Sequence, residues 1–284
     1  MNFFRHLLGF GAPDVDHGIW NLKRGARFGA YKITRKLGHG GKAASTVRAS
    51  AKTSAARTAI KEVALLRELR RLHLDNRYAS LLAVGHEGAV EYMAIQCHGP
   101  SLEDLMRKRL FGHFSVKTVL WLAPRMLKAV QNIHEAGYAH RDLKPANFLL
   151  GCGPQSRQVF VVDFGVARRY KNERAPGQWV RRPPRQHAPA RGTILFAPIA
   201  FHEFKEQASA DDLQSLFYTI VQMTVNLPWY NNLGSGHVGL AKIVVSTKTL
   251  CRRLPEEYNQ IWDYIKVLKY EDDPNGEFIT ALMR

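Results

Sequence analysis

The residues whose types could carry chemistry lie in two short stretches near the middle of the chain. The first reads Y-A-H-R-D-L-K-P-A-N and ends at Asn147, and the second reads D-F-G and begins at Asp163. The first stretch offers a carboxylate at Asp142 that could accept a proton, and a cation two positions later at Lys144. Asn147 and Asp163 offer the oxygen ligands that Mg²⁺ prefers. Phosphoryl transfer needs such a set, because it depends on positioning and on neutralising charge.

Both stretches match a known pattern. A protein-kinase catalytic loop has the form H-R-D followed by an asparagine, and D-F-G comes after it. The chain therefore resembles a eukaryotic-type protein kinase. The resemblance implies that Asp142 accepts the proton of the attacking hydroxyl, Lys144 reaches the transferred phosphate, and Asn147 and Asp163 hold Mg²⁺. The structural alternative is a polar turn before a strand, with an unrelated D-F-G.

Residues before these stretches resemble the parts of a kinase that hold ATP. Lys61 ends the run T-A-I-K, which is similar to the V-A-I-K of the third strand, whose lysine contacts phosphates. Gly38 and Gly40 match the first two glycines of G-x-G-x-x-G, and such glycines let backbone N–H groups approach phosphate. Ala43 stands at the third glycine position, preceded by Lys42. This incomplete loop predicts weak nucleotide binding, and a lone lysine such as Lys61 is usually a solvated surface residue.

The acidic partner of that lysine is harder to place. Kinases pair the strand lysine with a helix glutamate, roughly 14 residues later in relatives. Here Glu62 is adjacent to Lys61, and Glu68 is only 68 − 61 = 7 residues on. The sequence therefore predicts a shortened helix, with the ion pair either rebuilt with Glu68 or lost. Glu68 could also be an exposed helix charge. A misread gene segment would also make the helix after Lys61 look shortened.

Several motifs resemble the casein kinase 1 superfamily, most closely its tau-tubulin kinase-like branch. They are G-P-S-L-E-D-L from Gly99, H-R-D-L-K-P-A-N-F-L-L-G from His140, R-G-T followed by A-P-I-A from Arg191, D-D-L-Q-S-L-F-Y from Asp211, and L-P-W from Leu227.

That resemblance assigns further roles. It implies that Gln96, Cys97 and His98 form the hinge that meets adenine. It also implies that Thr193 is the activation-segment threonine near the catalytic aspartate, which favours serine and threonine as acceptors. Asp212 matches the buried helix aspartate that supports the backbone of the catalytic loop.

The chain is strongly basic, with 41 lysines and arginines against 24 acidic residues and a net charge of +17 over 284 residues. Such a charge favours an anionic partner, and the resemblance implies acidic or phosphorylated protein substrates. Arginine clusters bind phosphate well, although the run could also be a solvated flexible loop, and Leu195 replaces an arginine of the family's anion site. The basic run consists of Arg168, Arg169, Lys171, Arg174, Arg181, Arg182, Arg185 and Arg191.

The periodicity of the apolar residues outlines the elements. Apolar spacing predicts helices at 62–73, 116–136, 211–226, 255–268 and 276–283. Strands are predicted at 31–37, 45–49 and 92–96, and a loop at 168–192. We expect an α+β, two-lobed kinase fold, with an N-terminal extension over residues 1–30 and a kinase domain over 31–284. The antiparallel first lobe would cover 31–97, and the mainly helical second lobe 98–284.

We therefore predict a serine/threonine protein kinase that transfers the γ-phosphate of ATP with Mg²⁺. The alternative is a pseudokinase scaffold with impaired ATP binding, and a nucleic-acid-binding protein is disfavoured because no such motif occurs. Three scattered cysteines give no disulfide framework, so we expect the cytoplasm or the nucleus. No signal peptide or membrane-spanning stretch is predicted, and we expect a monomer.

Overall fold

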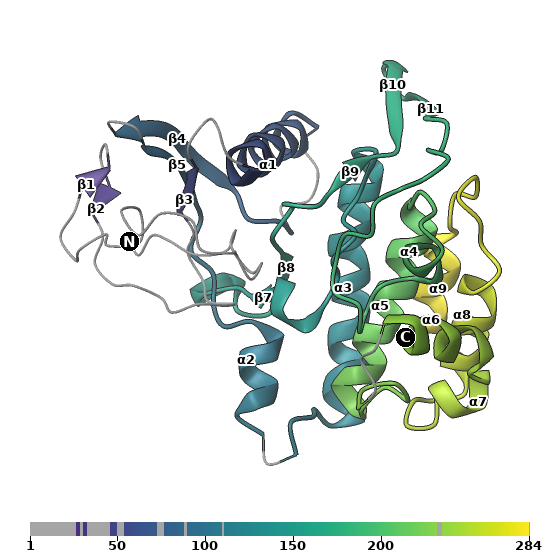
Figure 1. Ribbon diagram of the computed structural model, residues 1–284. Coiled ribbons are helices and arrows are strands. Elements are labelled where there is room, and N and C mark those ends of the chain that lie inside the picture. The colour runs from purple at the N-terminus through teal and green to yellow at the C-terminus, as the bar shows by residue number, and fades with distance from the viewer. Residues whose placement is uncertain are drawn as a thin grey trace. The chain divides into compact units, whose positions relative to one another are not determined.

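The computed structural model describes residues 27–28, 31–32, 46–49, 54–72, 77–87, 90–109, 111–231 and 235–283. Gly38, Gly40 and nearly all of residues 1–30 lie outside the described residues, so the glycine loop and the N-terminal extension stay predictions. The chain forms two compact units (Figure 1). The first unit comprises Met1–Leu105 with Ala146–Gly165, and the second comprises Met106–Pro145 with Val166–Arg284.

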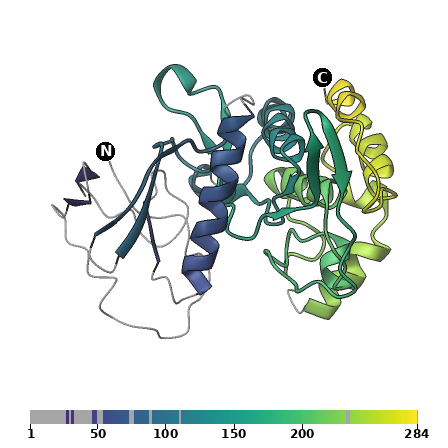
Figure 2. The ribbon, with the colours of Figure 1, turned by 90° about the horizontal axis from the view of Figure 1, so that it is seen from above.

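The first unit is built on a three-stranded antiparallel sheet in the order β3-β5-β4. Its longest helix, α1, lies beside these strands (Figure 2) and buries Leu65, Leu66 and Leu69. A second antiparallel pair joins β7 to β8. The elements of this unit are β1 Arg27–Phe28, β2 Tyr31–Lys32, β3 Thr46–Ala49, α1 Ser54–Arg71, β4 Leu81–Glu87, β5 Val90–Ile95, β7 Phe148–Leu150, the 3-10 turn Gly153–Gln155 and β8 Val159–Val161.

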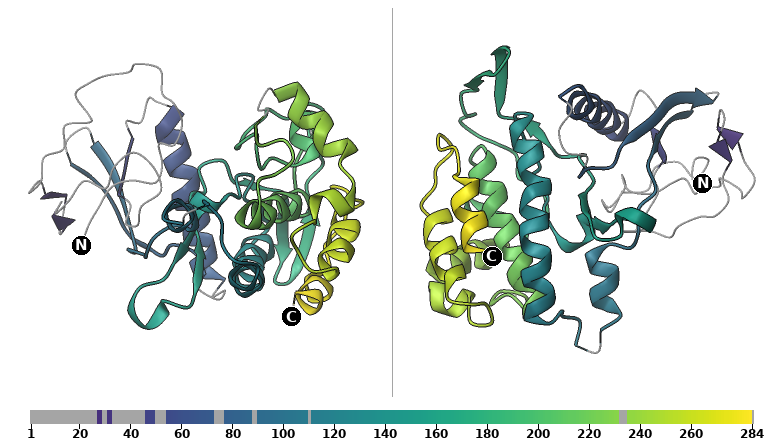
Figure 3. Two further views of the ribbon diagram at one scale, coloured as in Figure 1. Left: turned by 90° about the horizontal axis from the view of Figure 1, so that it is seen from below. Right: turned by 180° about the vertical axis from the view of Figure 1, so that it is seen from behind.

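The second unit is mainly helical. Helix α5 is buried along almost its whole length and packs against α3 and α8 (Figure 3). Ser115 caps α3 by accepting a hydrogen bond from the backbone N–H of Thr118 at 3.2 Å, which satisfies one of the free donors at a helix start. The elements are α3 Val116–Glu135, β6 Tyr138–Ala139, β9 Arg168–Arg169, β10 Lys171–Ala175, β11 Gln178–Arg181, α4 Ile199–His202, α5 Ser209–Thr224, α6 Ser235–Val244, α7 Thr247–Leu250, α8 Glu257–Ile265 and α9 Gly276–Leu282.

Two elements cross the division between the units along the chain. Helix α2 (Leu102–Arg107) starts after Ser101, whose hydroxyl accepts a hydrogen bond from the backbone N–H of Asp104 at 3.0 Å. The 3-10 turn Pro145–Asn147 ends the catalytic-loop sequence. The predicted α+β fold class is confirmed, and no helix within the described ranges is long and apolar enough to cross a membrane.

Two predicted elements were wrong. The basic segment 168–192 was expected to be a loop, but it contains β9 and the antiparallel hairpin of β10 and β11. Gly177 at the tip of the hairpin has φ of 76°, a conformation that glycine adopts without strain. The run T-A-I-K was expected to be a strand, but it lies inside α1, which begins at Ser54. The helix after Lys61 is therefore not shortened, because it has eighteen residues and starts before Lys61.

Candidate active site

The second unit brings Asp142, Lys144 and Thr193 into one hydrogen-bonded cluster. The ammonium group of Lys144 donates to Oδ2 of Asp142 at 2.7 Å and to the hydroxyl of Thr193 at 2.9 Å. That hydroxyl in turn donates to Oδ1 of Asp142 at 2.7 Å. Asp142 is 7% exposed, so its carboxylate is oriented by neighbours rather than by solvent. The cluster combines a proton acceptor, a cation and a hydroxyl, which is the arrangement that the sequence predicted.

Asp212 on α5 holds the backbone of the catalytic loop. Its buried carboxylate accepts hydrogen bonds from the backbone N–H groups of His140 at 2.6 Å and Arg141 at 2.8 Å. Nε2 of His134 lies 2.9 Å from Oδ2 of the same group. Burial alone would raise the pKa of Asp212, but the hydrogen bond and charge of His134 lower it below its ordinary value. The loop residue Arg141 has φ of 67°, a costly conformation that these hydrogen bonds stabilise.

Gly192 allows the activation segment to approach the catalytic loop. Its φ is 126°, and a Cβ atom built there would lie 2.4 Å from the carbonyl oxygen of Arg141. Any side chain would therefore push apart the two segments that carry Asp142 and Thr193. The sequence showed this glycine within R-G-T, but the motif alone gave no sign that its role is steric.

Three arginines of the second unit converge on one buried carboxylate. Glu206 is 5% exposed and receives two hydrogen bonds from the guanidinium of Arg185, one of them from Nη2 at 2.9 Å. Nε of Arg168 lies 3.2 Å and Nη1 of Arg141 4.0 Å from Oε1 of Glu206. Burial raises the pKa of Glu206, but Arg185 and its neighbours lower it below the ordinary value. Part of the basic run is therefore an ordered internal network, and not a solvated loop.

The predicted metal ligands lie in the first unit, at one end of the β7–β8 pair. Phe148 pairs with Val161 in the register of these strands, and the backbone N–H of Val162 donates to the carbonyl oxygen of Asn147 at 3.0 Å. Asn147 thus precedes one strand and Asp163 follows the other, at the same edge. An amide oxygen and a carboxylate suit Mg²⁺, and no group of three His, Cys, Asp or Glu side chains among the described residues forms a rival metal site.

Glu62 adds a second acidic group to this part of the first unit. It is 3% exposed, its Oε1 accepts a hydrogen bond from the backbone N–H of Phe164 at 3.5 Å, and its Oε2 has no hydrogen-bond partner within the part of the chain that is described. Burial, and after it the charge of Asp163, raise the pKa of Glu62 well above its ordinary value. Burial therefore favours the neutral form of this carboxyl group unless a cation lies beside it, and the choice of Glu62 as the acidic partner stays a prediction.

The structure corrects the position of Lys61. It lies on α1 with an exposed side chain, next to the buried Glu62, whereas a lysine on the third strand was expected. Neighbouring helix residues point about 100° apart, so Lys61 and Glu62 lie on different faces of the helix. Glu68 forms a surface ion pair with Arg71 at 3.1 Å, and a rebuilt pair with Glu68 stays a prediction.

The predicted hinge residues follow β5 in the first unit. The backbone N–H of Gln96 donates to the carbonyl oxygen of Ser80 at 2.8 Å, so this donor is already engaged. Cys97 is exposed, whereas His98 is 3% exposed and its ring centroid lies 4.3 Å from that of Phe160. Burial lowers the pKa of His98 to about 4, which keeps the ring neutral at physiological pH. Adenine contacts by these three residues stay a prediction.

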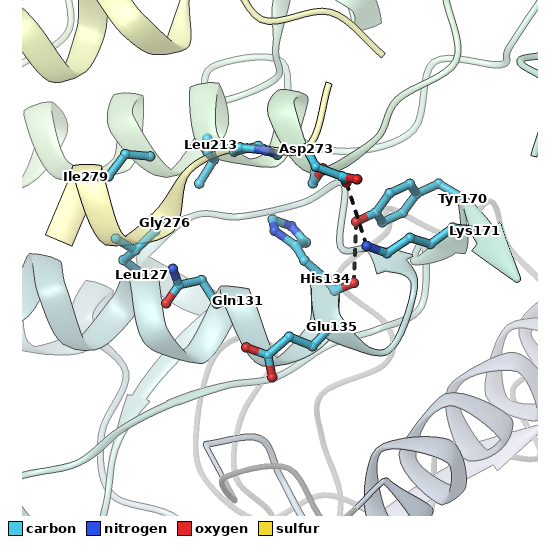
Figure 4. A pocket seen from close by; sticks show the side chains of 12 residues that line it. Leu127, Gln131, His134, Glu135, Tyr170, Lys171, Leu213, Asp273, Gly276 and Ile279 are labelled. Atoms are coloured by element: carbon cyan, nitrogen blue, oxygen red, sulfur yellow. Dashed lines mark hydrogen bonds and ion pairs between the residues drawn. The ribbon is translucent and has the colours of Figure 1, made fainter. Parts of the chain in front are cut away.

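A pocket of about 200 Å³ lies on the second unit between α3, α5, α9 and the start of β10 (Figure 4). Its lining includes His134, whose ring contacts Asp212 and whose carbonyl oxygen lies 3.4 Å from the hydroxyl of Tyr170. Lys171 and Asp273 form an ion pair of 3.7 Å at its rim. Apart from Lys171 of the basic run, no residue to which the sequence analysis assigned a role lines this pocket, and none of the Asp142 cluster does.

Comparison with known proteins agrees with this geometry. The model of the protein kinase domain matches residues 30–188. A probable serine/threonine-protein kinase of Dictyostelium discoideum is 35% identical over 217 residues, which cover 76% of this chain and 43% of that protein. The chain thus spans less than half the length of this relative. With the kinase-domain match extending over more than half of its residues, the chain belongs to the protein kinase family.

Proposed function

We propose that the chain is a serine/threonine protein kinase that transfers the γ-phosphate of ATP to hydroxyl groups of proteins. The observation that carries this proposal is the hydrogen-bonded cluster of Asp142, Lys144 and Thr193, with distances of 2.7–2.9 Å. The cluster has a base for the attacking hydroxyl and a cation for the phosphate. The name of the Dictyostelium relative supports serine and threonine as acceptors.

Each group of the cluster has a defined task in this mechanism. Asp142 orients the substrate hydroxyl and accepts its proton, and Lys144 donates hydrogen bonds to the transferred phosphoryl oxygens. Thr193 fixes the carboxylate of Asp142 from the activation segment. Asn147 and Asp163 would hold Mg²⁺, which when bound neutralises negative charge on the phosphates.

The cation that meets the ATP phosphates is proposed at Arg48 and not at Lys61. Arg48 lies on β3, the strand that pairs with β5, in register with Tyr92. It precedes Glu62 by 62 − 48 = 14 residues, the separation expected between the strand cation and the helix glutamate. Among the described residues no group hydrogen-bonds to the buried Oε2 of Glu62, which supports a cation in this unit.

Two matched variants test this assignment. We expect Arg48→Ala to raise the KM for ATP roughly tenfold or more, because phosphate binding loses a charged donor, while Lys61→Ala leaves it within about twofold because an exposed lysine contributes little. Arg48→Lys should retain most of the affinity. Steady-state kinetics with varied ATP measures all three. A large effect of Lys61→Ala with none for Arg48→Ala would reverse the assignment.

We further propose acidic or phosphorylated protein substrates and a place in the casein kinase 1 superfamily, close to its tau-tubulin kinase-like branch. Support comes from the net charge of +17 and from the exposed Arg174 and Arg191, the latter two residues before Thr193. The motifs that end in D-D-L-Q-S-L-F-Y and L-P-W support the branch.

A pair of peptides tests the substrate preference. The two share one central serine and differ only in four flanking positions, which are glutamate in one and glutamine in the other. We expect kcat/KM to be about tenfold higher for the acidic peptide at low salt and the advantage to shrink as salt screens the charges. Arg191→Gln should reduce the preference, with Arg253→Gln, at an exposed position in the turn after α7, as control. Equal rates for both peptides at low salt would contradict the proposal.

The free cysteines bear on the proposed location in the cell. The cysteines Cys97, Cys152 and Cys251 are free thiols, which supports a reducing compartment such as the cytoplasm or the nucleus. We propose that the domain acts as a monomer. The pseudokinase alternative loses one of its two supports, since α1 is not shortened.

A further inference from the structure

Lys242 on α6 is a buried amine with an unusual set of partners. Lys242 is only 2% exposed. Its Nζ atom donates to the carbonyl oxygens of Ile194 at 2.7 Å and Ala197 at 2.6 Å, and lies 3.2 Å from Nε2 of His202. An ammonium group has three N–H donors, and these three acceptors satisfy all of them when His202 carries its proton on Nδ1. The partners therefore match the charged form of the lysine.

Two aromatic rings complete the surroundings of this cation. Nζ of Lys242 lies 5.2 Å from the ring centroid of Tyr218 and 5.4 Å from that of Trp229, within the range of cation–π attraction. Burial lowers the pKa of Lys242 to about 7, and no carboxylate in the described ranges forms an ion pair with it. Burial of a cation without a counter-ion costs free energy. A gain in stability therefore does not explain why a lysine is buried at this position.

Two of the three partners of Lys242, the carbonyl groups of Ile194 and Ala197, belong to the turn that directly follows Thr193. Within the turn, the backbone N–H groups of Phe196 and Ala197 both donate to the carbonyl oxygen of Thr193 at 2.9 Å. From outside, Nε1 of Trp229 donates to the carbonyl oxygen of Leu195 at 2.9 Å. Lys242 and Trp229 together thus fix three carbonyl groups within four residues.

Close packing of α6 on α4 brings the lysine to this turn. A Cβ atom built on Gly239, one helical turn before Lys242, would lie 3.0 Å from the ring of His202. Glycine at this position lets the helix approach closely enough for the ammonium group to reach both the imidazole and the carbonyl oxygens. The close contact between α4 and α6 therefore allows this set of hydrogen bonds to form.

We propose that Lys242 is a positioning residue that holds the turn 193–197 in the shape that receives the protein substrate. The inference rests on the proposed kinase function. Thr193 binds the catalytic Asp142 directly, and the apolar side chains of Ile194 and Leu195 stay half-exposed beside it. Those side chains form the surface for substrate residues next to the acceptor hydroxyl, and Lys242 sets their position through the carbonyl groups.

The first test compares Lys242→Met with Lys248→Met, a matched change at an exposed lysine of α7. We expect Lys242→Met to raise the KM for a serine peptide roughly five- to tenfold, because the turn loses hydrogen bonds from a charged donor. The KM for ATP should stay within about twofold, as nucleotide does not contact the turn in the proposed mechanism. Trp229→Phe, which removes the donor to Leu195 together with part of a buried ring, should raise the peptide KM less.

Hydrogen exchange of the backbone gives a readout that does not need activity. In Lys242→Met the amides of Phe196 and Ala197 should exchange faster, while those of α5 keep their protection. If the wild type transfers phosphate and Lys242→Met changes neither the peptide KM nor this exchange, the positioning role is wrong and the proposed function stands. If the wild type transfers no phosphate, hydrogen exchange alone decides whether Lys242 positions the turn. If Lys242→Met does not fold, Trp229→Phe decides by the same two measurements.

Discussion

Asp142→Asn is expected to lower kcat for phosphoryl transfer by about 10²- to 10⁴-fold, the range for loss of a general base. The amide keeps the size of the side chain, and its single oxygen can still accept from either Lys144 or Thr193, but it cannot take a proton from the substrate hydroxyl. Because the amide matches the carboxylate in shape and retains one of the two hydrogen bonds of 2.7 Å, the local fold should stay intact. The KM for ATP should change little.

Steady-state kinetics and thermal unfolding of the same preparations check this result. Glu257→Gln at the exposed start of α8 is the matched acid-to-amide control, and it should retain wild-type kcat. A folded Asp142→Asn variant with kcat within threefold of the wild type would remove Asp142 from the chemistry.

Asp212→Asn is expected to lower the free energy of unfolding by roughly 3–5 kcal/mol, because it breaks a buried charged network. The carboxylate accepts from the backbone N–H groups of His140 and Arg141 and contacts His134. An amide offers one acceptor oxygen and turns its own N–H groups toward donors, so at least one of these partners is left unsatisfied. Arg141 would also lose support for its φ of 67°, and kcat should fall with stability.

The pH dependence of the free energy of unfolding distinguishes a charged hydrogen-bond network at Asp212 from packing alone. The pKa of Asp212 lies below its ordinary value in the folded protein, so its contribution is present above the unfolded pKa and is lost as pH falls through the folded pKa. Urea unfolding between neutral and acid pH should show this loss in the wild type and a smaller one in Asp212→Asn. Asp273→Asn, at a side chain that is 69% exposed, should cost at most about 1 kcal/mol. Equal acid slopes for wild type and Asp212→Asn would contradict the account.

Long periodic elements and the catalytic groups could be predicted from the sequence. The apolar stripe of residues 116–136 specifies α3, whose observed bounds are Val116–Glu135. The cluster of Asp142, Lys144 and Thr193 was also predictable, because the family that the chain resembles brings the motifs of these residues together. These parts depend on local pattern and on the requirements of phosphoryl transfer.

Short apolar runs could not be assigned in the same way. T-A-I-K fits a strand or a buried part of a helix, and periodicity over four residues does not separate them. The alanines of S-A-A-R-T-A, which begin α1 at Ser54, favour the helix. The hairpin of β10 and β11 was missed because K-N-E-R-A has little β-propensity and is held by its partner strand.

Long-range contacts outside the recognised motifs could not be predicted from the sequence. Nothing in the local pattern around Lys242 or Glu206, or in the R-G-T motif that contains Gly192, indicates what these residues contact. Each has its role because a distant segment lies against it: the turn after Thr193, the three arginines, and the carbonyl oxygen of Arg141. Pairing of residues this far apart along the chain carries no local signal.

Transfer of label from γ-³²P-ATP to casein in the presence of Mg²⁺, followed by separation of the phosphorylated amino acids, tests the central claim most directly. The account predicts label on phosphoserine and phosphothreonine with the wild-type chain, and its loss with Asp142→Asn at the same concentration and folded fraction. Equal labelling by the wild type and by Asp142→Asn, or label only on phosphotyrosine, would contradict it.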